Sequence, residues 1–392
     1  MDPLRQKAVE TFEKVYGTKP VCVAFAPGRV ELLGNHTDYN GGFVLSVALD
    51  LGIAVAAARK PGYEPLVEVY SDEFRASDSF PLERVVPEAK GSWANYPRGV
   101  VRELARAGVP LRGARLAIVS NLPIGAGVSS SAALELATAE ALYHIYGGKP
   151  RDPMEEAKLC QRAENSFVGV PCGILDQFSS LFGKKDHGLF LDCATLRHQL
   201  APLGREDVRV VLFDSGEKHA LVDGKYAEAR ASCERAVKRL GELLCEDLRF
   251  LRDVTVQQFE RYAHELEPDD RRRAEHVIRE NARVLRGLAA LKTRQYDELR
   301  RLMLESHASS RDLFGNSTPA LDYLVERASE AEGFLGGKLT GGGFGGSTVS
   351  LVEERQVEKF AGEVAADFER KFSRVPRRLI AGIGDGARAE PL

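Results

Sequence analysis

The sequence predicts a two-domain protein in which α-helices and β-strands are mixed, and three observations support this. The chain has 392 residues, which is enough for two domains and a substantial core. Short apolar segments of strand character are interspersed with longer segments of helical character in both halves. Polar and turn-forming residues accumulate between 195 and 208. We therefore place one domain at 1–203 and the other at 204–392.

Composition is that of an ordinary globular protein, with 44% hydrophobic residues, 28% charged residues and a net charge of −3. There is no basic excess to neutralise phosphates, so we expect no nucleic-acid partner. No segment is apolar and long enough to span a bilayer, and the N-terminus lacks the apolar region of a signal peptide. The six cysteines are scattered without a C-x-x-C pair and are expected to be reduced. We expect a cytoplasmic enzyme with no membrane partner.

The first half alternates between strands and helices. Residues 115–120 alternate as a strand does, whereas 132–146 are rich in the good helix formers Ala, Leu and Glu. By the same criteria, strands are expected at 21–25, 46–59, 66–71 and 115–120, and helices at 4–16, 99–107, 132–146 and 152–168.

The second half opens with an apolar strand at 208–213 and continues with helices of dense mixed charge. In one of them, Ile278, Ala282, Leu285 and Leu288 form an apolar stripe at helical spacing, so the charges are expected on solvated faces. The expected helices lie at 226–245, 271–292, 296–307 and 319–332.

A loop rich in small residues joins the strand at 115–120 to the helix that follows. Gly125 and Gly127 permit close backbone approach, and Ser129 to Ser131 bring hydroxyls to a helix start, where backbone N–H groups lack partners. Such a loop suits an anion, and a polyphosphate above all. It has neither the Lys of a Walker loop nor the third Gly of a dinucleotide fingerprint. Simple helix capping is the alternative.

A second chemically dense stretch covers residues 26–46, a turn-rich segment between apolar strands. Arg29, His36 and Asp38 lie there with Asn35 and Tyr39. A mixed set of donors and acceptors suits a polyol, although a solvated hairpin can carry the same residues.

Three further features allow two interpretations each. Asp176 lies among apolar neighbours and is either a hydrogen-bonded structural carboxylate or a catalytic one. Trp93, the single tryptophan, is either a core aromatic or a stacking partner for adenine. Residues 341–346 contain five glycines between two strands and form either a ligand support or a tight strand crossing.

Together these stretches resemble the galactokinase branch of the GHMP kinases. The family motif Pro-Gly-Arg-Val-Asn-Leu-Ile-Gly-Glu-His-Thr-Asp-Tyr-Asn is similar to residues 27–40, Pro-Gly-Arg-Val-Glu-Leu-Leu-Gly-Asn-His-Thr-Asp-Tyr-Asn. Residues 123–133 resemble the family's phosphate loop, and residues 173–178 resemble the segment with its catalytic Asp. Further similarity at 226–234, 307–314 and 341–346 extends the resemblance over nearly the whole chain.

The resemblance implies an α+β fold: an N-terminal ribosomal-S5-like α/β domain, a C-terminal ferredoxin-like α+β domain, and an active site in the cleft between them. It implies phosphorylation of the anomeric hydroxyl of galactose by MgATP, in a protein expected to be a monomer. Asp176 becomes the candidate general base and Arg29 the residue that stabilises charge.

The resemblance also implies three sets of binding residues. The sugar is expected to contact Asn35, His36, Thr37, Asp38, Gly173 and Tyr226. ATP is expected to contact Ser71, Trp93, Gly125, Ala126, Gly127, Val128, Ser129, Ser130 and Ser131. Mg²⁺ is expected to be held by Ser131 and Glu164.

The chain departs from the family pattern at three positions. Asn35 replaces a Glu that, in the family, contacts the far end of the sugar around its C6 hydroxyl. Because Asn is neutral and also donates, the related sugars galacturonate, L-arabinose and N-acetylgalactosamine stay open as substrates beside galactose. Glu31 for Asn and Ser347 for Cys are expected to affect packing around the site more than the chemistry.

A galactose sensor that binds sugar and ATP but barely transfers phosphate is a further alternative. One sensor of this kind lacks a Ser-Ala pair after the phosphate loop, whereas residues 129–133 here are uninterrupted. Asp176, Arg29, Ser131 and Glu164 are all present as well, which favours a kinase.

Overall fold

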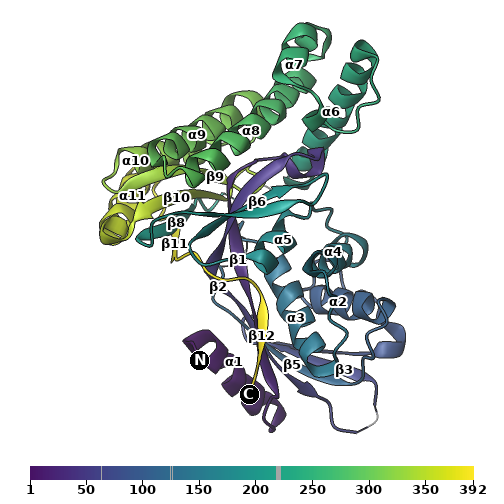
Figure 1. Ribbon diagram of the computed structural model, residues 1–392. Helices are drawn as coiled ribbons and strands as arrows, with labels where there is room; N and C mark the ends of the chain where they lie inside the picture. The colour runs from purple at the N-terminus through teal and green to yellow at the C-terminus, as the bar shows by residue number, and fades with distance from the viewer. Residues whose placement is uncertain (63, 124, 126, 218–221) are drawn as a thin grey trace.

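The computed structural model describes residues 1–62, 64–123, 125, 127–217 and 222–392 (Figure 1). Within these ranges the strands form an eight-stranded and a four-stranded sheet. The main path of the larger sheet runs β12-β1-β2-β5-β3-β4, with β6 paired to β2 and β7 paired to β6. Its strands are β1 (Cys22–Leu33), β2 (Phe43–Arg59), β3 (Leu66–Ser71), β4 (Ala76–Pro81), β5 (Ala114–Ser120), β6 (His187–Asp192), β7 (His198–Pro202) and β12 (Arg388–Pro391).

Strand β1 is longer than the sequence predicted and carries the first part of the chemically dense stretch. Its pairing with β2 shifts register between Pro27 and Arg29, where a residue without a backbone N–H interrupts the ladder, and again between Glu31 and Leu33. Strand structure resumes after each shift. Arg29 therefore lies on a strand, not in the predicted turn, and only the segment between β1 and β2 turns.

Helix α1 packs on one face of the larger sheet and α3 and α5 on the opposite face, where α2 and α4 cover α3 (Figure 1). Helix α1 begins where the Asp2 side chain accepts hydrogen bonds from the backbone N–H groups of Leu4 and Arg5, and Gly17 ends it in a left-handed conformation. These helices are α1 (Pro3–Tyr16), α2 (Asn95–Arg106), α3 (Ser130–Tyr146), α4 (Pro153–Ala163) and α5 (Leu175–Phe182).

The smaller sheet is antiparallel, with strand order β11-β8-β10-β9. It comprises β8 (Val208–Asp214), β9 (Phe334–Thr340), β10 (Ser347–Glu353) and β11 (Arg377–Ala381). The helices of this half are α6 (Val222–Leu244), α7 (Val256–Tyr262), α8 (Pro268–Lys292), α9 (Tyr296–Ser309), α10 (Pro319–Glu330) and α11 (Val357–Phe372). Helices α6 and α7 project at the upper right of Figure 1. No helix in the described ranges is long and apolar enough to cross a membrane.

Short helical turns complete the secondary structure. Two of them are π-helical and continue α4 and α9, so the predicted helix 152–168 is α4 followed by a wider turn that contains Glu164. These turns are η1 (Asp38–Asn40), η2 (Leu82–Arg84), η3 (Glu164–Val168), η4 (Leu251–Asp253), η5 (Ala263–Glu265), η6 (Ser310–Phe314) and η7 (Glu354–Gln356).

The two sheets share one apolar core. The same cluster contains Leu33 and Leu45 from the larger sheet and Val210 and Leu351 from the smaller one. The last strand, β12, returns to the larger sheet and pairs with β1, and Figure 1 shows the two chain ends near each other. The predicted boundary at 203/204 separates β7 from β8, but a simple division there does not account for β12.

We expect Gly386→Ala to destabilise the protein by about 1–3 kcal/mol, because it overpacks the segment that leads into β12. A Cβ at this position would lie 2.1 Å from the carbonyl oxygen of Leu181. Urea unfolding followed by circular dichroism measures the change. Gly362→Ala is the matched control: its Cβ would meet no atom within 4 Å, and Ala should stabilise α11 by up to about 1 kcal/mol. Equal stability of the two variants would contradict the packing described here.

Candidate active site

A cavity of about 680 Å³ lies where the end of β1, the start of α5, helix α6 and the glycine-rich loop after β9 meet. Most of the residues predicted to bind the sugar or to catalyse the reaction come from separate parts of the chain and line it together. These are Arg29, Asn35, His36, Asp38, Gly173, Asp176 and Tyr226.

Asp176 lies in the first turn of α5, where unpaired backbone N–H groups and the helix dipole favour a carboxylate. Its Oδ1 accepts hydrogen bonds from Nε and Nη2 of Arg29 at 2.8 and 2.5 Å, and its Oδ2 accepts one from Oγ of Ser129 at 2.5 Å. Arg29 is nearly buried, and its Nη1 donates to the carbonyl oxygen of Gly127 at 2.8 Å. The arginine thus joins the carboxylate to the predicted phosphate loop.

The predicted phosphate loop has the backbone that an anion site needs. Gly125 and Gly127 have φ of 77° and 72°, which glycine adopts without strain. Ser129 has φ of 57° and begins α3 without a side-chain cap, so the structure does not support the alternative of simple helix capping. The first N–H groups of α3 therefore have no side-chain cap within the described residues and are suited to an anion. Ala126, predicted to contact ATP, lies outside the described residues.

Two residues of this loop make contacts within the protein, and their contact with ATP stays a prediction. The side chain of Val128 is buried in the core, and its carbonyl oxygen accepts from the backbone N–H of Arg29 at 3.0 Å. The hydroxyl of Ser129 points to Asp176, not to a phosphate. Both residues therefore fix the loop through these contacts with the rest of the protein.

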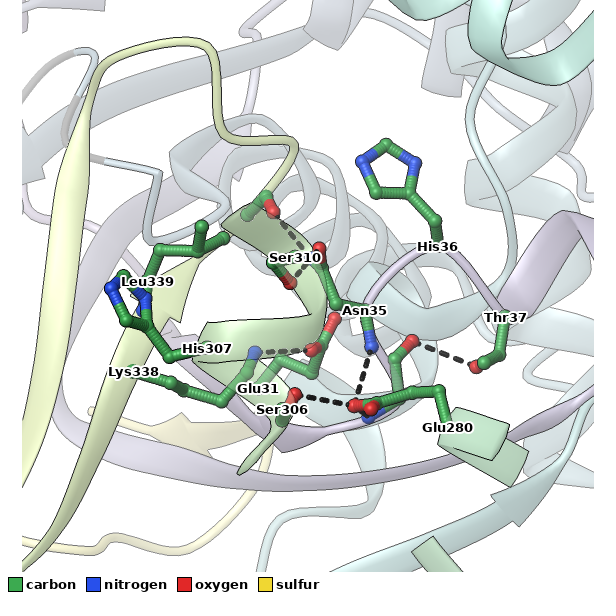
Figure 2. Close-up of polar contacts among 12 residues, drawn as sticks. Glu31, Asn35, His36, Thr37, Glu280, Ser306, His307, Ser310, Lys338 and Leu339 are labelled. Atoms are coloured by element: carbon green, nitrogen blue, oxygen red, sulfur yellow. Dashed lines mark hydrogen bonds and ion pairs between the residues drawn. The ribbon is translucent and has the colours of Figure 1, made fainter. Parts of the chain in front are cut away.

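Asn35 is 1% exposed, and both polar atoms of its side chain are engaged by the protein (Figure 2). Its Oδ1 accepts from Asn316 Nδ2 at 2.9 Å and from Ser310 Oγ at 3.3 Å, and its Nδ2 donates to the carbonyl oxygen of Gly341 at 2.8 Å. The amide therefore ties the turn after β1 to the glycine-rich loop. One of the two N–H groups of Nδ2 makes no further hydrogen bond to a described residue, and Asn35 lines the cavity, so its direct contact with the sugar stays a prediction.

Thr37 is also turned away from the cavity. Its side chain is fully buried, and its hydroxyl lies within hydrogen-bonding distance of the carbonyl oxygens of Gly34 and Phe43, at 2.7 and 2.6 Å. This residue stabilises the turn between β1 and β2, and its contact with the substrate stays a prediction.

His36 lines the cavity with its ring rather than with a free nitrogen. A carbonyl oxygen only accepts, so the contact of 3.0 Å with Gly342 places a proton on Nε2. Burial lowers the His36 pKa to about 3, so Nδ1 is unprotonated and accepts from the Tyr39 hydroxyl at 3.0 Å. The ring stacks on Phe314 with centroids 4.1 Å apart. In Figure 2 it points away from Asn35.

Asp38 and Gly173 meet at the opposite wall of the cavity. A Cβ on Gly173 would lie 2.0 Å from Oδ2 of Asp38, so only glycine leaves room for this carboxylate. Burial raises the pKa of Asp38 to about 6, and the nearby carboxylates of Asp176 and Glu31 also raise it. Tyr226 of α6 lines the cavity beside the His36 ring, with centroids 5.4 Å apart.

Glu164 lies in the π-helical turn after α4, close to the start of α3. Its carboxylate is buried and interacts with the Ser131 hydroxyl, which brings the two predicted Mg²⁺ ligands together. Gln177 Nε2 donates to Glu164 Oε2 at 2.7 Å and to Glu135 Oε2 at 3.0 Å. Burial, followed by the charge of Asp176, raises the pKa of Glu164.

The Ser131–Glu164 pair fits a hard divalent cation. One carboxylate and one hydroxyl are the few protein ligands that Mg²⁺ takes, and a cation beside them would offset the buried negative charge. In the ranges that the structure describes, no group of three or more His, Cys, Asp or Glu side chains is arranged to hold a metal. Phosphate oxygens and water would supply the remaining ligands.

A second cavity of about 330 Å³ opens on the other side of the helix start. Trp93 stacks on Phe74 there, with centroids 5.9 Å apart and planes 7° apart. The predicted nucleotide residues Ser71, Trp93, Ser130 and Ser131 all line this cavity. A flat aromatic wall beside the phosphate loop is suited to an adenine base.

Several residues of the site escaped the sequence analysis. Gln177 directly follows Asp176, and this position next to the candidate base could have indicated it. Glu135 lies in a helical segment and had no feature that distinguished it from other helix residues. Phe74 and Asn316 carried no motif, because their roles depend on contacts with Trp93 and Asn35 far along the chain.

Comparison with known protein families matches three regions of the chain. The galactokinase galactose-binding signature covers residues 10–59, and the N-terminal and C-terminal GHMP kinase domains cover residues 95–184 and 288–370. The chain is 42% identical to the galactokinase of Chloroflexus aggregans over 375 residues, which is 96% of this chain and 95% of that protein. It is 36% identical to the galactokinase of Bacillus subtilis over 390 residues, covering 98% of this chain and 99% of that protein.

Solved structures give the same result. Lactococcus lactis galactokinase complexed with galactose superposes with a TM-score of 0.91 at 32% identity, covering 97% of this chain and 98% of that one. A mevalonate kinase has a TM-score of 0.66 at 18% identity over 93% of this chain and 99% of that one, and shares the fold. Both comparisons confirm the α+β fold that the sequence motifs implied.

We expect Asp38→Asn to change the pH dependence of stability. In the parent, the unfolded state releases the Asp38 proton near pH 4 while the folded state keeps it to about pH 6, so the parent loses stability over this interval as pH rises. Relative to the parent, Asp38→Asn should gain up to about 3 kcal/mol between pH 4 and pH 7. Urea unfolding at several pH values measures this.

The control is Asp312→Asn, because Arg311 lowers the pKa of that exposed carboxylate. Its stability relative to the parent should fall, not rise, with increasing pH. The same trend in both variants would contradict the raised pKa of Asp38, which burial and the neighbouring carboxylates cause.

Proposed function

Because the chain belongs to the galactokinase family of the GHMP kinases and is therefore an ATP-dependent sugar kinase, we propose that its substrate is galactose. The product is α-D-galactose 1-phosphate, formed by transfer of the γ-phosphoryl group of ATP to the anomeric hydroxyl, with release of ADP. One observation carries the proposal: Asp176, paired with Arg29, faces the sugar cavity at the point where the phosphate loop reaches it.

Asp176 accepts the proton of the anomeric hydroxyl as its oxygen bonds to the γ-phosphorus and the bond from that phosphorus to the β–γ bridging oxygen breaks. The Arg29 guanidinium neutralises charge on the carboxylate and on the transferring group. Ser129 fixes the second carboxylate oxygen, which orients Asp176. General base catalysis of this kind contributes about 10²–10⁴-fold to rate.

The ATP phosphates bind the loop at 125–131 and the start of α3, and adenine stacks beside Trp93 and Phe74. Ser131 and Glu164 would hold Mg²⁺, which neutralises phosphate charge when bound. Gln177 donates a hydrogen bond to the Glu164 carboxylate, so that its orientation does not depend on the cation.

Two alternatives from the sequence find less support. No observation favours galacturonate, L-arabinose or N-acetylgalactosamine over galactose, since the Asn35 amide is engaged within the protein. The assembled pair of Asp176 and Arg29 favours a working kinase over a sensor. We also propose that the protein is cytoplasmic, in keeping with its six free cysteines. We propose further that it is a monomer.

Asp176→Asn should lower kcat by about 10²–10⁴-fold, because an amide cannot take up the hydroxyl proton. ATP binding should persist, since the phosphate loop is unchanged. A coupled ADP-release assay measures kcat, and calorimetry with a non-hydrolysable ATP analogue measures binding. The matched control is Asp78→Asn, which breaks a similar ion pair with Arg98 (2.6 Å) outside both cavities and should leave kcat unchanged. Loss of less than fivefold in Asp176→Asn would exclude it as the base.

A panel of sugars tests the substrate itself. With MgATP, ADP release should be fastest with galactose among galactose, galactosamine, N-acetylgalactosamine, galacturonate, L-arabinose and glucose. Faster turnover of another sugar would change the assignment of substrate. Galactose binding without turnover would instead favour a sensor.

A further inference from the structure

We propose that the Glu31 carboxylate binds the sugar and that Lys338 holds it in place. The proposal rests on the proposed function and adds a specificity-determining residue to it. Glu31 accepts a hydrogen bond from one hydroxyl of galactose through the oxygen that does not contact Lys338.

The position of Glu31 on β1 directs it to the cavity. Arg29 and Glu31 are two residues apart on the strand and share a face, whereas Val30 and Leu32 between and beyond them are buried in the apolar core. Both Arg29 and Glu31 line the same cavity. The strand therefore presents a cation for the reacting end of the substrate and, one pleat further on, a carboxylate.

Lys338 of β9 fixes the position of this carboxylate. Its side chain is fully buried, and its Nζ lies 2.8 Å from Oε1 of Glu31 (Figure 2). A buried ion pair contributes little net stability compared with an apolar pair of the same volume, because both charges lose their hydration. Because Glu31 also lines the cavity, the pair suits a role in binding.

The neighbouring carboxylates show that Glu31 faces the same space as the predicted sugar ligands. Its charge raises the pKa of Asp38, as does that of Asp176. Oε1 is engaged by Lys338, and no described residue donates a hydrogen bond to Oε2. A hydroxyl of a bound sugar is the natural donor for this oxygen, because an ionised carboxylate accepts hydrogen bonds only.

The residue types at positions 31 and 35 support the same inference. Glu31 and Asn35 are the reverse of the Asn and Glu that stand at these places in the motif quoted above. The Asn35 amide is hydrogen-bonded to Gly341 and Asn316, whereas the carboxylate of Glu31 lies at the cavity wall. In this chain the carboxylate available to the sugar is therefore four residues earlier.

The test combines Glu31→Gln with sugars that lack one hydroxyl. For galactose, Glu31→Gln should lower kcat/KM about 10- to 100-fold, as expected for a lost hydrogen bond to a charged group. Among 2-, 3-, 4- and 6-deoxygalactose, one sugar should be used equally by parent and variant, because the hydroxyl bound by Glu31 is already missing. Calorimetric binding of the same sugars without ATP gives a second readout.

The control is Glu103→Gln, which neutralises another buried carboxylate that is paired with Arg102 and Arg106 on α2, away from the cavity. It should leave the ranking of sugars unchanged. If Glu31→Gln does not fold, Glu31→Gln with Lys338→Met removes the unpaired ammonium as well, and the comparison is made on that variant.

An equal loss for galactose and for all four deoxy sugars would overturn the proposal, because Glu31 would then act only as the counter-ion of Lys338. A parent that neither binds nor phosphorylates galactose would overturn the proposed function, and this inference with it. If the parent uses galactose, and Glu31→Gln loses activity with galactose and with every deoxy sugar except one, the result supports both.

Discussion

The ion pair between Arg29 and Asp176 is the contact on which the arrangement of the site depends. It joins a strand near the N-terminus to the first turn of α5, and Arg29 also holds the phosphate loop through Gly127. Three segments that are far apart in sequence are thereby fixed within hydrogen-bonding distance. Because the guanidinium is planar with several donors, one side chain can serve both a carboxylate and a carbonyl.

A layer of buried polar contacts beneath the cavity joins the two halves of the molecule. Glu280 of α8 accepts from the backbone N–H of Gly34 at 2.9 Å and from the Ser306 hydroxyl at 2.6 Å (Figure 2). Burial would raise its pKa, but Arg283, His276 and Lys338 outweigh that and lower the pKa to about 2. The carboxylate therefore stays ionised and pins the turn that bears Asn35 and His36.

The same layer explains why several polar residues of the predicted sugar-binding segment are engaged within the protein. A buried donor or acceptor without a partner destabilises the fold, so the polar atoms of Asn35 and Thr37 and the ring nitrogens of His36 are all paired within the protein. Asp38 and Glu31 remain as carboxylates at the cavity wall. The site thus separates residues that shape the cavity from residues that face it.

The sequence alone determined the family and most of the helices, although it missed α5, α7 and α11, and it predicted the main chemical groups: Arg29, Asp176, the phosphate loop and Glu164. These lie in local motifs, and local motifs are readable without tertiary information. It missed β4, β6, β7, β11 and β12, which are short or lack apolar alternation and exist because a neighbouring strand completes their hydrogen bonds. It also predicted that Asn35 and Thr37 contact the sugar, and this stays a prediction. Only the tertiary structure decided which way these side chains face, because Ser310, Asn316 and Gly341 approach Asn35 from the other end of the chain.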